Sequence, residues 1–155
     1  MKDQSTQNWL VIGGGLIGQL TALSLCQLAT QHEKYRQQNI IITHIFAKPP
    51  VDPRTTGIMA TSVPLFKKLG LWEKLQPSAY PLTHIHLYDG THNIIRAPEI
   101  HFNSQEIGLP AFGYNISNNL MRETMDAQLE NFDCYEPKIG AAKHINQLNL
   151  SLIHI

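Results

Sequence analysis

The stretch Leu10-Val11-Ile12-Gly13-Gly14-Gly15-Leu16-Ile17-Gly18 decides the fold, because an apolar strand runs directly into a G-x-G-x-x-G turn. Gly13 permits a tight turn at the strand end, and Gly15 lacks the Cβ that would keep a phosphate away from the backbone. Gly18 lets the following helix pack closely on the strand. The turn therefore predicts a site where backbone N–H groups and a helix dipole meet the pyrophosphate of a dinucleotide.

The residues around the turn supply the strand–turn–helix context that such a motif requires. We predict a helix from Leu16 to about Leu28, in which Ala22 is small enough to keep the helix against the sheet. A second strand over 40–47 gives a β-α-β start with a parallel pair. The alternative is a glycine turn with a purely structural role. The predicted cofactor-binding residues of the turn are Gly13, Gly14, Gly15, Leu16, Ile17 and Gly18.

One part of a complete dinucleotide site is absent from the sequence. The second strand of such a unit normally ends on an acid that binds the adenosine ribose hydroxyls. That position falls near Ala47, and the only nearby acid, Asp52, lies in a proline-rich loop. We therefore expect weaker binding of the ribose, while the pyrophosphate site remains predicted.

The rest of the chain predicts short helices and strands in alternation. Residues 48–53 read as an extended loop because prolines remove donors and restrict their predecessors. The other expected elements are a helix capped at Thr61 or Ser62 and closing at Gly70, a helical turn over 71–75, a hairpin of 83–88 and 93–97 around Asp89-Gly90, a strand over 109–116, a helix from Asn118 or Asn119 to Leu129, and strands over 138–145 and 148–155.

Composition narrows the function classes. Lys+Arg and Asp+Glu balance at 12 each, so the chain has no basic field for nucleic acid. No apolar run is long enough to span a bilayer, and residues 1–8 lack the layout of a signal peptide. Cys26 and Cys134 do not suggest a disulfide framework, and a cytoplasmic location is expected.

Histidines raise the question of a metal site. His84 and His86 alternate on one face of a predicted strand, together with Tyr88. A metal site needs a third ligand and a second shell, and neither is evident in the sequence. We expect a partly exposed strand face and no metal.

Five segments, taken in order, carry a family resemblance: 11–22, 52–59, 62–72, 81–90 and 113–120. Together they resemble the FAD-dependent aromatic hydroxylases of the para-hydroxybenzoate hydroxylase type. The closest similarity is to the ubiquinone-biosynthesis branch, such as the 2-polyprenyl-6-methoxyphenol hydroxylases. Order and spacing are similar to that branch over most of the chain, which is far more specific than the glycine motif alone.

The resemblance implies an α/β fold with a Rossmann-like FAD-binding βαβ start and part of an inserted, β-rich substrate region. It makes residues 1–155 the N-terminal part of a single FAD-binding monooxygenase domain. Within it, about 8–80 and 110–155 would form the FAD-binding portion, and about 81–109 a substrate-side hairpin.

The resemblance also gives two arginines a cofactor role. Arg54 follows the second strand, where family members bring an arginine toward the flavin cofactor, and Arg122 resembles a second cofactor-side position. A guanidinium there can pair with phosphate or ribose oxygens through its rigid fork. The alternatives are a solvated loop residue for Arg54 and a solvated helix residue for Arg122.

The implied function is hydroxylation of an aromatic ring, with FAD as cofactor, NAD(P)H as electron donor and a small aromatic or quinol-type substrate. The cofactor carries the chemistry while the protein orients it and excludes water, so no catalytic acid or base is predicted. The family also implies peripheral association with the inner membrane or with a biosynthetic complex.

Family members are longer, and their second and third flavin-binding segments have no counterpart in this sequence. We therefore expect an N-terminal fragment with little or no hydroxylase activity by itself. The glycine run alone also fits a small NAD(P)-binding Rossmann module, although the Arg54 segment and the hairpin argue against it. A non-functional gene remnant is the other alternative.

Overall fold

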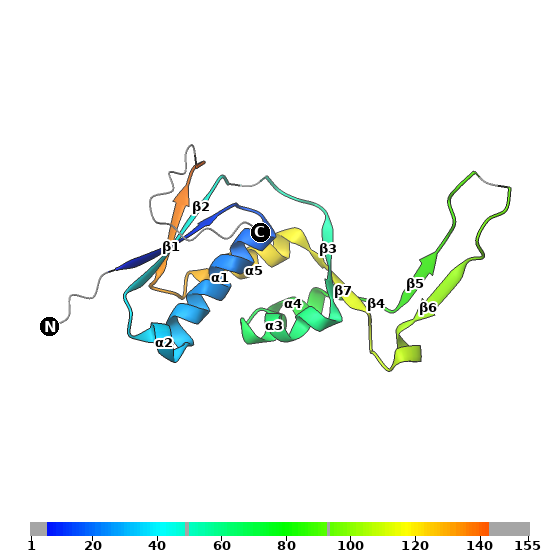
Figure 1. The fold of residues 1–155 in the computed structure, drawn as a ribbon, viewed down its shortest axis with the longest axis horizontal. Helices are drawn as coiled ribbons and strands as arrows, with labels where there is room; N and C mark the ends of the chain where they lie inside the picture. The colour runs from blue at the N-terminus through cyan, green and yellow to red at the C-terminus, as the bar shows by residue number, and fades with distance from the viewer. Residues whose placement is uncertain (1–5, 49, 93, 143–155) are drawn as a thin grey trace. The chain divides into compact units, whose positions relative to one another are not determined.

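The apolar run before the glycine turn forms a strand, as expected. In the computed structural model, which describes residues 6–48, 50–92 and 94–142, this strand is β1 (Gln7–Ile12). It leads through the turn into helix α1 (Leu16–Gln31), then the short helix α2 (Glu33–Arg36) and strand β2 (Ile40–Phe46), which is parallel to β1 (Figure 1). The predicted β-α-β start is therefore confirmed.

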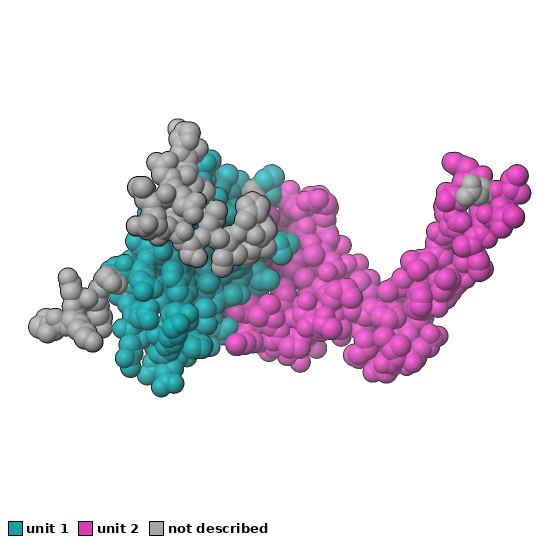
Figure 2. Space-filling model, in the orientation of Figure 1, with its two compact units in different colours: residues 1–50, 132–155 teal, residues 51–131 magenta. Residues whose placement is uncertain are grey.

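The chain divides into two units, one of residues 1–50 and 132–155 and one of residues 51–131 (Figure 2). In the first unit, β2 is the central strand, because β1 and β8 (Tyr135–Ile139) both pair with it in parallel. Helix α1 packs on this sheet. The core residues of the unit are Val11, Ala22, Leu23, Cys26, Ala29, Ile40, Ile42 and His44.

The last described strand differs from the prediction. We expected a strand over 138–145, but β8 begins at Tyr135 and ends at Ile139. Pro137, which has no backbone N–H to donate, is tolerated in β8 because this strand pairs with β2 on one side only among the described strands. Residues 143–145 and the expected strand over 148–155 lie outside the described residues.

The second unit contains an antiparallel sheet whose central strand is β7 (Gly113–Ser117), flanked by β3 (Thr55–Met59) and β4 (Tyr80–Leu82). Three helices belong to this unit: α3 (Val63–Lys68), α4 (Trp72–Leu75) and α5 (Asn118–Leu129). Short 3-10 turns lie at 60–62, 76–78 and 104–107. The core residues of the unit are Phe66, Leu69, Leu71, Trp72, Leu75, Ala111, Ile116, Met121, Met125 and Leu129.

Two outcomes in this unit follow from local chemistry. Helix α3 carries a proline in its first turn and ends before Gly70, whose φ of +70° suits a helix terminus, as predicted. Strand β3 was missed, because its residues, Thr55–Met59, are exposed or half-buried and show no apolar alternation. Its pairing with β7 makes it a strand.

The hairpin of the second unit has a longer loop than expected. Strand β5 (His84–Leu87) pairs with β6 (Ile100–Asn103), so the expected return strand over 93–97 is wrong. The Asp89 carboxylate accepts hydrogen bonds from the backbone N–H groups of Thr91, at 2.9 Å, and Ala97, at 3.0 Å. These bonds close a loop across residues 94–97, where the sequence predicts the return strand.

Candidate functional site

The glycine turn has the geometry expected of a phosphate-binding turn. Gly13 adopts φ +134°, a conformation that side chains rarely tolerate, and its N–H donates to the Ile45 carbonyl at 2.9 Å. A Cβ on Gly18 would overlap the Gly13 carbonyl oxygen, and a Cβ on Gly14 would lie 2.8 Å from the Ala47 oxygen. Space beside Gly15 is open, with no atom within 4 Å of a Cβ placed there. The protein therefore fills the space around Gly14 and Gly18 and leaves the face of Gly15 accessible.

The N-terminus of α1 faces this open position. Gly15 is the residue that precedes the first helical turn, no side chain caps the helix, and its first turn contains no acid. The first N–H groups of a helix have no partner inside the helix, and they carry its partial positive charge. Leu16 is half-buried and the Ile17 side chain is exposed. Both side chains are apolar, so each residue can donate to an acceptor only through its backbone N–H. The arrangement suits an anion approaching Gly15.

A buried histidine, which the sequence did not predict, is hydrogen-bonded to the glycine turn. His44, fully buried in β2, places Nε2 2.7 Å from the Gly13 carbonyl oxygen and Nδ1 3.0 Å from the Tyr135 hydroxyl. A carbonyl only accepts, so Nε2 carries the proton and donates to Gly13, and Nδ1 accepts from Tyr135. Hydrogen bonds of this kind fix the turn, since an unsatisfied buried carbonyl is costly.

The end of β2 lacks the ribose-binding acid, as the sequence indicated. The strand ends at Phe46, whose ring lies 4.6 Å from that of His44 between centroids, and the exposed Ala47 follows. Asp52, the nearby acid, belongs to the second unit and is engaged there by Arg54.

Arg54 takes part in a polar network at the start of β3. Its Nε and Nη2 donate to the two carboxylate oxygens of Asp52, at 2.8 and 2.9 Å. Asn118 donates to the same carboxylate at 2.8 Å and accepts from the Thr56 hydroxyl at 2.6 Å. These hydrogen bonds hold the pKa of Asp52 well below its usual range, and the bond from Arg54 contributes most, followed by that from Asn118. The Arg54 side chain is 80% exposed, so its outer edge is accessible to a ligand.

Arg122 lies in the second turn of α5 and is half-buried. Its Nε and Nη1 are buried, and neither has a hydrogen-bond partner among the described residues. Buried guanidinium nitrogens without an acceptor are rare, because each lost bond costs free energy. Arg122 is therefore only partly solvated, and its role toward a cofactor stays a prediction.

The two cysteines are unsuited to reaction chemistry. Both are free, and burial is the main cause that raises the pKa of the Cys26 thiol and of the Cys134 thiol. A thiol with a raised pKa holds little thiolate at neutral pH, which disfavours both cysteines as nucleophiles.

The structure thus brings the six residues of the glycine turn together in the first unit, whereas Arg54 and Arg122 belong to the second. Sequence reasoning missed His44 and Tyr135, and it placed Asn118 only at the start of a helix, without its bonds to Asp52 and Thr56. One signal existed for His44, since it is one of only two polar residues, with Thr43, in the otherwise apolar strand Ile40–Phe46, and a buried imidazole needs partners.

Comparison with known proteins identifies the fold. No protein-family model matches the chain. The chain is 27% identical over 136 residues to the 3-demethoxyubiquinol 3-hydroxylase of Escherichia coli, a match that covers 84% of this chain and 32% of that protein. The p-nitrophenol 4-monooxygenase of Pseudomonas putida superposes with a TM-score of 0.64 at 17% identity, over 93% of this chain and 34% of its own.

The chain has the fold of the flavin-dependent monooxygenases. The flavin-dependent monooxygenase PieE, solved with FAD and substrate, superposes with a TM-score of 0.62 at 16% identity, over 87% of this chain and 24% of its own. The resemblance to the FAD-dependent aromatic hydroxylases is confirmed. The chain spans about a third of the length of the relative that it matches in sequence. Among the described residues, no helix is long and apolar enough to cross a membrane.

Proposed function

We propose that this chain binds the ADP part of FAD and is the FAD-binding portion of a flavoprotein monooxygenase. The observation that carries the proposal is the glycine turn: Gly13 at φ +134°, held by His44, beside an open face at Gly15. The backbone N–H groups at the start of α1 would bind the pyrophosphate. Arg54 and Arg122 would supply charge-assisted bonds to acceptor oxygens of the cofactor.

We propose a small aromatic or quinol-type compound as the substrate and NAD(P)H as the electron donor. The support for the substrate class is the name of the relative from Escherichia coli, which acts on 3-demethoxyubiquinol. When bound, FAD supplies the redox chemistry by which O₂ is activated for ring hydroxylation. The hairpin region, about 81–109, would belong to the substrate side of the whole protein.

A competition experiment tests the binding proposal. The purified chain is titrated with FAD by calorimetry, and the titration is repeated with excess ADP or excess FMN present as competitor. If the site is the glycine turn, ADP displaces FAD and FMN does not, because only ADP contains the adenosine diphosphate part. Competition by FMN alone, or no saturable FAD binding, would overturn the proposal.

A matched pair of variants tests Arg122. Arg122→Gln removes the charge of the half-buried guanidinium. A hydrogen bond from a charged donor is worth about 1.5–3 kcal/mol, so we expect FAD affinity to fall by roughly 10- to 100-fold. Arg36→Gln on α2 removes an exposed arginine and serves as the control. Equal affinity in both variants would remove Arg122 from the site.

Activity is tested separately from binding. The chain is supplied with FAD, NAD(P)H and a quinol substrate, and product formation is followed. We expect little or no turnover, because the chain corresponds to 32% of the length of the relative. Robust substrate-dependent oxidation would contradict this expectation without affecting the binding proposal.

A further inference from the structure

The hairpin ribbon β5–β6 has two chemically different faces. Ile85, Leu87, Ile100 and Phe102 lie on one face because side chains alternate along a strand. On the other face, His86 lies directly opposite His101 in the strand register. Glu99 precedes His101 by two residues and therefore shares this face. The sequence alone hid the group, since the expected return strand over 93–97 does not contain His101.

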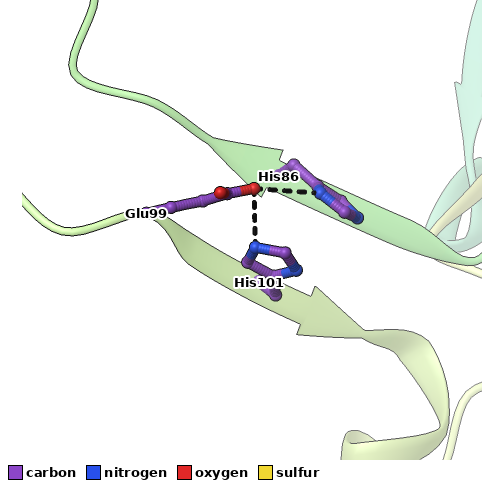
Figure 3. Close-up of side chains that lie close together, drawn as sticks. All are labelled: His86, Glu99 and His101. Atoms are coloured by element: carbon purple, nitrogen blue, oxygen red, sulfur yellow. Dashed lines mark hydrogen bonds and ion pairs between the residues drawn. The ribbon is translucent and has the colours of Figure 1, made fainter.

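These three side chains converge on one point (Figure 3). Glu99 Oε1 lies 2.6 Å from His101 Nε2 and 3.3 Å from His86 Nδ1, and the two imidazole rings are 4.1 Å apart between centroids. One ligand atom from each residue lies within 4.8 Å of the other two. All three residues are exposed, so an ion can enter from solvent without any rearrangement of a core.

We propose that His86, Glu99 and His101 bind a divalent transition-metal ion, with Zn²⁺ as the ion that suits the site best. Two imidazole nitrogens and one carboxylate oxygen form a donor set that Zn²⁺ accepts, and water can occupy a fourth, tetrahedral position. Zn²⁺ ligands at about 2.0–2.2 Å from the ion stand roughly 3.3 Å apart, so the present separations need only small side-chain adjustments. Mg²⁺ and Ca²⁺ prefer oxygen ligands and suit the site less well.

Neighbouring side chains help to orient the ligands. The Tyr88 hydroxyl is hydrogen-bonded to Glu99, which raises the pKa of Tyr88, and it lies 3.4 Å from His86 Nδ1. Without metal, both imidazole nitrogens face a carboxylate that only accepts, so each carries a proton toward Glu99. On metal binding each of these protons moves to the other nitrogen of its ring, which frees His86 Nδ1 and His101 Nε2 to coordinate the ion. The coordinate bonds then cross-link the two strands of the ribbon.

His84 provides an internal control on the same face. Its Nδ1 lies 2.9 Å from the Thr83 hydroxyl, and its Nε2 lies 3.4 Å from Asn103 Nδ2. His84 therefore lies two residues from His86 on the same face of β5, as Tyr88 does on the other side. It lies outside the group formed by His86, Glu99 and His101.

The test is a calorimetric titration of the full chain with ZnCl₂ after treatment with EDTA and dialysis. We expect one ion per chain, and we expect His86→Ala and His101→Ala each to weaken binding by at least about tenfold, since even outer-shell changes cost 10- to 100-fold. Glu99→Gln is expected to weaken it in the same direction, and His84→Ala to leave it unchanged. Loss of affinity in His84→Ala equal to that in His86→Ala, or full binding by the His86/His101 double variant, would overturn the proposal.

Amide hydrogen exchange provides a second readout that does not depend on affinity. Zn²⁺ should slow exchange across 84–87 and 100–103 in the wild-type chain and not in the double variant. The mutated side chains are exposed, and circular dichroism of each variant verifies that the fold persists. Unchanged exchange in the zinc-loaded wild-type chain would refute the cross-link between the strands.

Discussion

Gly15→Ala and Gly18→Ala are expected to separate cofactor binding from folding. Both add one methyl group to the same turn, yet the structure gives the two methyl groups different surroundings. At Gly15 the added Cβ has no atom within 4 Å, whereas at Gly18 it overlaps the Gly13 carbonyl oxygen and lies 2.9 Å from the carbonyl carbon. Gly15→Ala should therefore affect an approaching phosphate, and Gly18→Ala should affect the fold.

The magnitudes follow from these surroundings. Gly15 has φ −78° and ψ 171°, which alanine adopts freely, so reduced freedom of the unfolded chain stabilises by about 0.4–1 kcal/mol. Alanine is a poorer helix-capping residue than glycine, which offsets this gain. We expect a net change within about 1 kcal/mol. Overpacking at Gly18 costs about 1–3 kcal/mol, because backbone must move, and this lowers the melting temperature by roughly 2–12 °C for a chain of this size.

The assay pairs thermal unfolding, followed by circular dichroism, with FAD titration of each variant. We expect Gly15→Ala to melt near the wild-type temperature and to bind FAD at least about tenfold more weakly, a loss of about 1.4 kcal/mol or more. Gly18→Ala should have a lower melting temperature than the wild type. The reasoning is refuted if Gly15→Ala binds FAD as the wild type does, or if both variants lose the same stability.

Three further predictions address buried and paired groups. His44→Leu leaves the Gly13 carbonyl without a donor and should cost about 1–3 kcal/mol, more than the roughly 1 kcal/mol of Tyr135→Phe, as urea denaturation of both variants would show. The lowered pKa of Asp52 means that its stabilising effect is present above the ordinary carboxyl pKa, near 3.8, and is lost as pH falls through the folded value. Asp52→Asn should therefore lose less stability than the wild type on acidification below that pH, and equal losses would contradict this. Because burial raises the pKa of the Cys26 thiol, thiol reagents should modify it slowly in the native chain and rapidly in urea, and rapid native labelling would contradict its burial.

The parts of the fold that sequence predicted are those in which local chemistry decides. The glycine turn, α1 and β2 form one contiguous unit, so periodicity and turn residues suffice for them. Strand β3 was missed because its residues gain their strand conformation from pairing with β7, a partner far along the chain. The position of β6 was wrong because a single side chain, Asp89, binds two backbone N–H groups and extends the loop.

For the candidate site, too, the local motif was predictable from the sequence and the long-range contacts were not. A backbone motif such as residues 13–18 can be recognised from the sequence, since glycine is the residue that its geometry needs. Contacts between side chains that are far apart in the chain cannot be predicted from the sequence pattern. The contact of His44 with Tyr135 spans 91 residues, and that of Asp52 with Asn118 spans 66. Only the fold brings such partners together, and the same is true of Glu99 and His101 opposite His86.

The missing acid at the end of β2 separates two kinds of evidence that the glycine motif usually combines. The turn keeps its shape through bonds inside the protein, from His44 to Gly13 and from Gly13 to Ile45, and none of them involves Ala47. A ribose-binding carboxylate would act on the ligand alone. A well-formed turn is therefore evidence for the fold and for an open phosphate position, whereas our proposal assigns the cofactor affinity to the backbone N–H groups and to the arginines. This is why Gly15→Ala and Arg122→Gln, rather than any change at Ala47, are the substitutions on which the binding proposal depends.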